Sequence, residues 1–136
     1  MQDEPSKPTF ADRAALSRLG QRRYNFMTLP VAGIVVRFQS LSEIELSEYD
    51  NAPIKRDDDN DKVTVDEAVQ NTSRARLIIL CLVDGDGKRI LTDADLDWVC
   101  SWDPKDTLPL SEVLRDHCGI TDAVERRRLR EAAKKN

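Results

Sequence analysis

The chain has 136 residues, which is enough for one domain with a hydrophobic core and too few for two domains of ordinary size. Its formal net charge is −4, with 34% charged and only 5% aromatic residues, so the body of the chain is a poor candidate for a nucleic-acid surface. The longest apolar run, residues 77–83, is far shorter than the roughly 20 residues of a membrane-spanning helix, which argues against a membrane protein.

The N-terminal residues 1–9 are polar, contain two prolines and show no apolar period. We expect a flexible lead there and no secretory signal, because no apolar segment follows a basic one. The three cysteines, Cys81, Cys100 and Cys118, are an odd number, and we expect them to be buried, reduced thiols. The sequence therefore predicts a soluble intracellular protein whose ordered domain begins near residue 10.

Residues 10–53 carry the first predicted elements. The segment ADRAALSRLGQRR, residues 11–23, favours a short amphipathic helix that Gly20 ends. β-Branched and aromatic residues predict a strand over residues 33–39. Ser42 and Glu45 then fit a capping box, in which each side chain bonds the backbone N–H of the other residue. A helix should follow and end before a proline at position 53.

An acidic stretch, KRDDDNDK, occupies residues 55–62 and contains no apolar side chain. We expect a solvated loop, because such a segment cannot contribute to a core. Calcium binding through Asp57, Asp59 and Asp61 is the alternative, but the glycine and the bidentate glutamate that an EF-hand loop needs are both missing in that register. The loop interpretation is therefore preferred.

The middle segment, residues 64–83, is expected to supply the longest helix and the centre of the core. Thr64 and Glu67 form a second capping-box pattern, and apolar residues recur at helical spacing as far as Ile79. The apolar run that follows either finishes the helix or forms a strand, and periodicity leaves both possibilities open.

The segment LVDGDGKRILTDADLDWV, residues 82–99, combines a turn with a helix start. Asp86-Gly87 predicts a type I′ hairpin turn, from which the chain returns as an antiparallel strand. A calcium loop is the alternative, but the ligand positions fail in the register that the glycine sets. Thr92 and Asp95 predict the start of the next helix, through a hydroxyl cap and a carboxylate in the first turn.

Two further helices are expected to close the core. Leu96 and Val99 would point a short helix inward, and the segment DPKD that follows should end it. A longer helix is predicted over residues 108–118, with Pro109 in its first turn and Gly119 just past its end. Its buried stripe would consist of Leu110, Val113 and Leu114.

The C-terminal segment, residues 121–136, differs in charge from the rest of the chain. It contains six basic and three acidic residues and therefore carries +3, which leaves −7 for residues 1–120. Because it has few apolar anchors, we expect a helix that projects from the domain and orders against a partner. Its candidate partner-binding residues are Arg126, Arg127, Arg128, Leu129 and Arg130.

No pattern in the sequence indicates catalysis, a metal site or a cofactor. His117 and Cys118 are neighbours on a predicted helix, so their side chains diverge and cannot form a nucleophile–base pair. A zinc set drawn from the histidine and the cysteines lacks the short spacing typical of such sites, and no glycine-rich phosphate loop is present. Trp98 and Trp102, four residues apart, are either the edge of the core or anchors for a protein partner.

Three segments resemble the tail assembly chaperones of long-tailed, siphovirus-type bacteriophages and prophages: GIVVRFQSLSEIELSEYD, SRARLIILCLVDGDGKRILTDADLDWV and LPLSEVLRDHCGI. The similar features are structural: a strand with an arginine, a Ser-capped helix, an ARLI helix, a VD-x-x-G turn and a Thr-Asp helix start. They fall here on Arg37, Ser42 and residues 76–78, 83–87 and 92–95. The resemblance covers residues 24–120 and does not extend to the acidic stretch or the basic C-terminal segment.

The resemblance implies a non-enzymatic, cofactor-free assembly factor that acts in the host cytoplasm and is absent from the mature virion. Its expected partners are the long helical tape measure protein, which it would keep soluble, the tail tube protein, and further copies of itself in a homo-oligomer. A rival hypothesis is a small regulatory module that binds nucleic acid through its basic C-terminal segment. For the fold, we expect a small, mostly helical α+β single domain over residues 10–120 with one short antiparallel β-ribbon.

Overall fold

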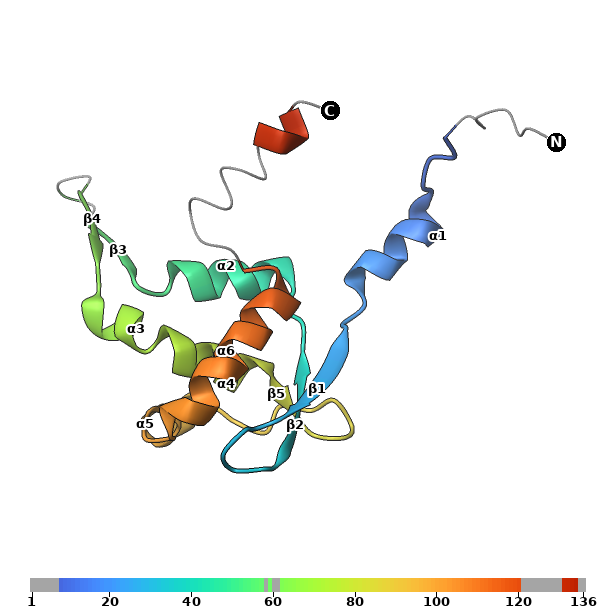
Figure 1. The fold of residues 1–136 in the computed structure, drawn as a ribbon. Coiled ribbons are helices and arrows are strands. Elements are labelled where there is room, and N and C mark those ends of the chain that lie inside the picture. The colour runs from blue at the N-terminus through green and yellow to red at the C-terminus, as the bar shows by residue number, and fades with distance from the viewer. Residues whose placement is uncertain (1–7, 58, 60–61, 121–130, 135–136) are drawn as a thin grey trace.

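The computed structural model describes residues 8–57, 59, 62–120 and 131–134. The body of the chain is a small, mostly helical α+β domain, as the sequence predicts (Figure 1). Helices cover one face of a three-stranded antiparallel sheet, and a separate two-stranded hairpin stands beside them. The strand content is therefore larger than the single ribbon that was predicted.

The elements follow one another in a mixed order. They are α1 (Arg13–Leu16), the 3₁₀-helix η1 (Ser17–Gly20), β1 (Tyr24–Thr28), β2 (Val35–Gln39), α2 (Glu43–Asn51), β3 (Ile54–Asp57), β4 (Lys62–Val65), α3 (Glu67–Asn71), α4 (Ser73–Cys81), β5 (Leu82–Val83), the 3₁₀-helix η2 (Asp93–Asp95), α5 (Leu96–Cys100) and α6 (Pro104–Cys118).

The central strand of the main sheet is β2, which pairs antiparallel with β1 on one side and β5 on the other. Gly33, with φ +70°, closes the β1–β2 hairpin, and its N–H bonds the carbonyl of Leu29. Phe38 on β2 is fully buried, whereas Phe26 on β1 is 67% exposed. One face of the sheet therefore covers the core and the other faces solvent.

Helices α4 and α6 supply the helical half of the core and pack against each other (Figure 1). Leu110 and Leu114, one helical turn apart on α6, have no exposed surface. Val113 is 38% exposed, so the prediction that it belongs to the buried stripe of α6 is wrong. The other buried apolar residues of the core include Leu77, Ile78, Ile79, Cys81, Leu82, Leu91 and Val99.

Several predicted helix boundaries are confirmed. Ser42 and Glu45 form the reciprocal capping box at the start of α2, and Thr92 and Asp95 form another at the start of η2. The 3₁₀-helix η1 ends at a glycine, and α6 ends at Gly119 in the left-handed conformation with φ +71°. These signals are local, which is why the sequence reveals them.

The predicted long central helix is wrong, because it is two helices. Thr72 leaves the helical region, with φ −99° and ψ 12°, and its hydroxyl donates to two carbonyls of the preceding turn. The cap of α3 is Asp66, whose carboxylate accepts from two N–H groups of the first turn. The predicted capping box of Thr64 and Glu67 is therefore also wrong, and Thr64 lies in β4. Among the residues that the structure describes, the longest helix is α6, with 15 residues.

The acidic stretch over residues 55–62 is not simply a loop. Its first residues belong to β3, and Lys62 begins β4, which pairs antiparallel with β3. All the residues of both strands are exposed, so the hairpin contributes no buried side chain to the core. Composition alone cannot distinguish such a hairpin from a loop.

Helix α6 begins at Pro104, four residues before the predicted start. Asp103 caps it by accepting from the N–H of Lys105, and Pro104 fills the first helical position, where its missing N–H has no consequence. The DPKD segment therefore follows the end of α5, as predicted, and also contains the start of α6. Pro109 consequently lies inside the helix rather than in its first turn.

The chain leaves α4 as a strand, β5, which resolves the choice that periodicity left open. In the turn that follows, the N–H of Gly87 bonds the carbonyl of Asp84, so the central residues are Gly85 and Asp86. Gly87, at φ +81°, follows them, whereas Gly85 does not have a positive φ, so the predicted type I′ turn is wrong both in its position and in its type. The return strand amounts to one bridge, at Arg89.

Candidate partner-binding groove

An open apolar groove of about 470 Å³ lies between the β1–β2 hairpin loop, the loop after β5 and helix α5. Its floor is formed by Leu29, Leu82 and Leu91, each at most 5% exposed. Leu29 is more than 50 residues from the other two in the sequence, and only the folded chain brings them together. The volume falls in the ~300–1,000 Å³ range of protein pockets for sizeable apolar ligands.

The rim of the groove is also apolar. Ile34, Ile90 and Trp98 line it and are each between 57% and 59% exposed. Single exposed apolar residues are ordinary on protein surfaces, but several around one apolar hollow mark a binding surface. Sequence analysis selected only Trp98 of these three, because Ile34 and Ile90 lie in segments expected to form strands.

The two tryptophans meet edge to face, with ring centroids 5.3 Å apart and an interplanar angle of 89°. Trp102 packs against the core, whereas Trp98 presents its ring at the groove rim. The sequence left open whether these tryptophans form the edge of the core or anchor a partner, and each interpretation fits one of them. Trp102 is the edge of the core, and Trp98 is placed as an anchor for a partner.

Asp106, at the first turn of α6, fixes the edge of the groove. Its carboxylate accepts from the N–H groups of Val31, at 2.7 Å, and Ala32, at 3.1 Å, in the β1–β2 loop. The side chain is buried, and these bonds are charge-assisted. Sequence reasoning missed this residue, because a first-turn aspartate looks the same whether it faces solvent or a distant loop.

The surroundings of the groove are acidic. Residues 89–106, which include η2, α5 and the start of α6, contain five aspartates and two basic residues, a net charge of −3. Asp103 lines the groove and is exposed. An apolar partner with basic flanks is therefore electrostatically favoured over an acidic one.

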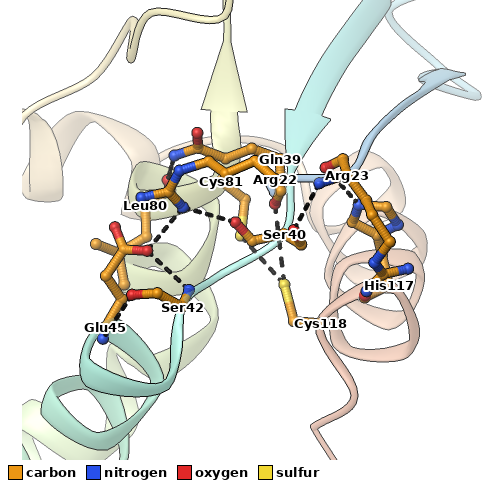
Figure 2. Close-up of polar contacts among 10 residues, drawn as sticks. All are labelled: Arg22, Arg23, Gln39, Ser40, Ser42, Glu45, Leu80, Cys81, His117 and Cys118. Atoms are coloured by element: carbon orange, nitrogen blue, oxygen red, sulfur yellow. Dashed lines mark hydrogen bonds and ion pairs between the residues drawn. The ribbon is translucent and has the colours of Figure 1, made fainter. Parts of the chain in front are cut away.

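At the opposite end of β1, polar contacts fix the point where the N-terminal segment joins the domain (Figure 2). The guanidinium of Arg22 donates to the Ser40 carbonyl at 2.8 Å and pairs with Glu45 at 2.7 Å. Arg23 exchanges bonds with Ser40, and its guanidinium donates to the His117 carbonyl at 2.6 Å. We call these five residues the arm anchor.

The ion pair with Arg22, together with bonds from Ser42, lowers the pKa of Glu45 from its usual 4.5 to about 2. The native state thus favours the ionised carboxylate. Its stabilising contribution is complete above pH 4.5 and is lost as the pH falls toward 2.

Replacing Glu45 with glutamine is therefore expected to lower the free energy of unfolding at pH 7 by about 1 kcal/mol, a modest value because the pair is partly exposed. The difference from the unmodified protein should vanish as the pH approaches 2. Urea unfolding at a series of pH values measures it. Glu48→Gln, an exposed change on the same helix, is the control. A difference that stayed constant down to pH 2 would contradict the assignment.

The histidine and the cysteines make separate contacts. His117 contacts the Arg23 carbonyl through Nε2 and meets the edge of the Phe38 ring. Cys81 and Cys118 lie 3.7 Å apart, and both the contact with Cys118 and burial raise the pKa of the Cys81 thiol. Cys100 is exposed, so the prediction of three buried thiols is wrong for that residue.

The remaining predicted binding residues, Arg126, Arg127, Arg128, Leu129 and Arg130, lie outside the described residues. In the part of the chain that the structure describes, no three His, Cys, Asp or Glu side chains are arranged to hold a metal ion. Within the same residues, none of the helices combines the length and apolarity needed to cross a membrane. Comparison of the chain with protein-family models, with curated proteins and with solved structures found no match.

Proposed function

We propose that this chain is a tail assembly chaperone of long-tailed bacteriophages that covers apolar helical segments of the tape measure protein until tail tube subunits replace it. The observation that carries the proposal is the apolar groove with its exposed rim of Ile34, Ile90 and Trp98. The resemblance of residues 24–120 to that class supplies the identity of the partner. The protein acts as a binding factor, with no chemical step.

The physical need for such a factor follows from the partner. A long helix whose apolar stripe awaits assembly exposes a large apolar surface, and surfaces of that kind aggregate unless they are covered. An amphipathic helix places apolar side chains at i, i+3, i+4 and i+7, and these enter an apolar groove on a binding protein. The groove offers a floor for such side chains and a rim that packs against their neighbours.

The polar groups of the groove favour a peptide over a small polar ligand. Both carboxylates that line it are committed to the backbone: Asp106 accepts from the β1–β2 loop, and Asp103 caps α6. They contribute negative charge rather than directed bonds to a ligand. A segment with apolar side chains and flanking lysine or arginine matches this combination.

Co-expression with the tape measure protein of the same phage tests the proposal. We expect this chain to raise the soluble recovery of the tape measure protein and to form a complex that size exclusion with light scattering detects. Ile34→Gln and Trp98→Gln should each weaken the complex by about tenfold or more, because each removes apolar area from the rim. Ile44→Gln is the matched control, since Ile44 is 68% exposed on α2, outside the groove.

Two results would overturn the proposal. One is the absence of both rescue and complex when the two proteins are well expressed. The other is loss of binding in the Ile44 variant to the same extent as in the Ile34 variant. A low-salt gel shift addresses the nucleic-acid rival, since phosphate binding through the basic C-terminal segment would weaken steeply as salt increases.

A further inference from the structure

We propose that the N-terminal arm, residues 10–20, of one copy of this chain binds in the apolar groove of a second copy. The contact is head to tail, and it causes the protein to self-associate. The tape measure helix and the arm then compete for one groove. The competition rests on the proposed function, whereas the docking of the arm does not.

The arm is helical, and its apolar side chains are exposed among the residues that the structure describes. α1 and η1 run on from each other, and Asp12 caps the first by accepting from the N–H of Ala15 at 2.9 Å. None of the residues in either helix is buried. Phe10 is 86%, Leu16 52% and Leu19 82% exposed. Because Leu16 and Leu19 are three residues apart, they lie on one side of the helical segment and form an apolar edge.

The arm anchor directs this segment away from its own domain. Arg22 and Arg23 are held by the Ser40, Glu45 and His117 contacts described above (Figure 2). Figure 1 shows α1 leading outward from the end of β1 opposite the β1–β2 loop. The arm therefore has a fixed starting point and a helix that is already formed, which reduces the entropy that a partner must remove when it binds.

Docking in the same molecule conflicts with this geometry. Ile34, on the groove rim, lies beside Leu29, and six strand residues at ~3.3 Å each separate Leu29 from Arg23 by about 20 Å. Leu19 is three residues from Arg22 and can reach at most about 11 Å from it. While α1 and η1 stay helical, the arm can therefore enter its own groove only if the anchor breaks, whereas the groove of a second copy is accessible without any rearrangement.

The arm and the groove are complementary in character as well as in position. The arm presents Leu16 and Leu19 with Arg13 and Arg18 beside them, and the groove is apolar with an acidic surround of net charge −3. Because the two surfaces differ, the contact is heterologous, and each bound pair still offers one free arm and one free groove. One such arm buries less than a standard interface, so self-association should be weak and dependent on concentration.

Sedimentation equilibrium of the full chain over a wide concentration range tests the proposal. The unmodified protein should self-associate, and Leu16→Gln/Leu19→Gln should weaken this by about tenfold or more, as should Ile34→Gln. Ala14→Gln, on the opposite side of α1, and Ile44→Gln are the matched controls. Glutamine favours helix nearly as well as leucine, so the arm should stay helical.

Mixing the variants gives the sharpest result. The arm variant keeps an intact groove and the Ile34 variant keeps an intact arm, so the mixture should form a 1:1 heterodimer that grows no further. A peptide of residues 8–21 should bind the arm variant, shift its tryptophan fluorescence and compete with the tape measure helix.

Three outcomes would overturn the proposal. They are an unmodified protein that stays monomeric throughout, an Ile34 variant that self-associates normally, and a mixture that forms no heterodimer. Retention of tape measure binding in any of these cases would leave the proposed function intact. Conversely, arm exchange without tape measure binding would refute the proposed function alone.

Discussion

Replacing Phe38 with alanine is expected to lower the free energy of unfolding by about 3–5 kcal/mol. The ring is fully buried, lies on the central strand of the main sheet and meets the imidazole of His117 edge to face at 5.1 Å. Alanine would remove the apolar area and leave a cavity between β2 and α6. Because small domains are stable by only about 5–15 kcal/mol, this change takes a large share of the total. Urea unfolding followed by circular dichroism measures the loss.

Phe26→Ala is the matched control for this prediction. Phe26 lies on β1, on the solvent face of the same sheet, and is 67% exposed. Its replacement is expected to change the unfolding free energy by roughly 0.5 kcal/mol or less, as surface substitutions usually do. Equal losses for the two variants would show that the solvent-facing side of the sheet is covered by another part of the molecule or by another copy.

The fold was predictable wherever a signal is local. Ser42 with Glu45 and Thr92 with Asp95 reveal helix starts, since a capping side chain and its N–H partner are within three residues of each other. Gly119 reveals a helix end for the same reason. The one capping pattern that failed, at Thr64, fulfils the spacing rule equally well, but its residue pairs with β3 instead. Pairing of β4 with β3 competes there with helix formation, and the capping pattern contains no information about β3.

The binding surface was largely invisible to sequence reasoning. Trp98 was identified by its residue type and by its spacing from Trp102, while Ile34, Ile90 and the buried Asp106 were not selected. The groove joins residues 29–36, 82–91 and 98–106, and its hollow depends on how the β1–β2 loop approaches α5 and α6. No period or spacing within one segment encodes that approach. The arm was predicted as an amphipathic helix, but whether its apolar edge would be covered could only be learned from the structure.

The arm and the groove lie at opposite ends of β1, and the same strand therefore sets the distance between them. On the two proposals, one small domain binds another copy through its arm and binds either an arm or the tape measure helix through its groove. A copy that binds through its arm leaves its own groove free for the next arm or for the tape measure helix. In a head-to-tail series only the terminal copy has a free groove, so on the proposed function the tape measure helix would bind single copies or the end of a series, and its binding should shorten the series.

Replacing Asp106 with alanine is expected to destabilise the domain by about 1–3 kcal/mol and to weaken binding in the groove. The buried carboxylate is the acceptor for the N–H groups of Val31 and Ala32, and alanine would leave both without that acceptor. The loop that carries Ile34 would lose its tie to α6, so the rim would no longer be held in place before a partner arrives. Urea unfolding measures the first effect, and titration with the peptide of residues 8–21 measures the second.

Asp106→Asn separates the two roles of this side chain. An amide oxygen still accepts an N–H bond, but the charge is lost, so we expect a smaller loss of stability and a groove that is partly preserved. Asp116→Ala, an exposed change on the same helix, is the control for altered charge and helix propensity. If Asp106→Ala lowered stability without weakening peptide binding, the rim would be held by the packing of Leu29 and its neighbours, and the carboxylate would serve the fold alone. If both quantities fell in alanine and recovered together in asparagine, the hydrogen bonds to the loop would be what shapes the groove.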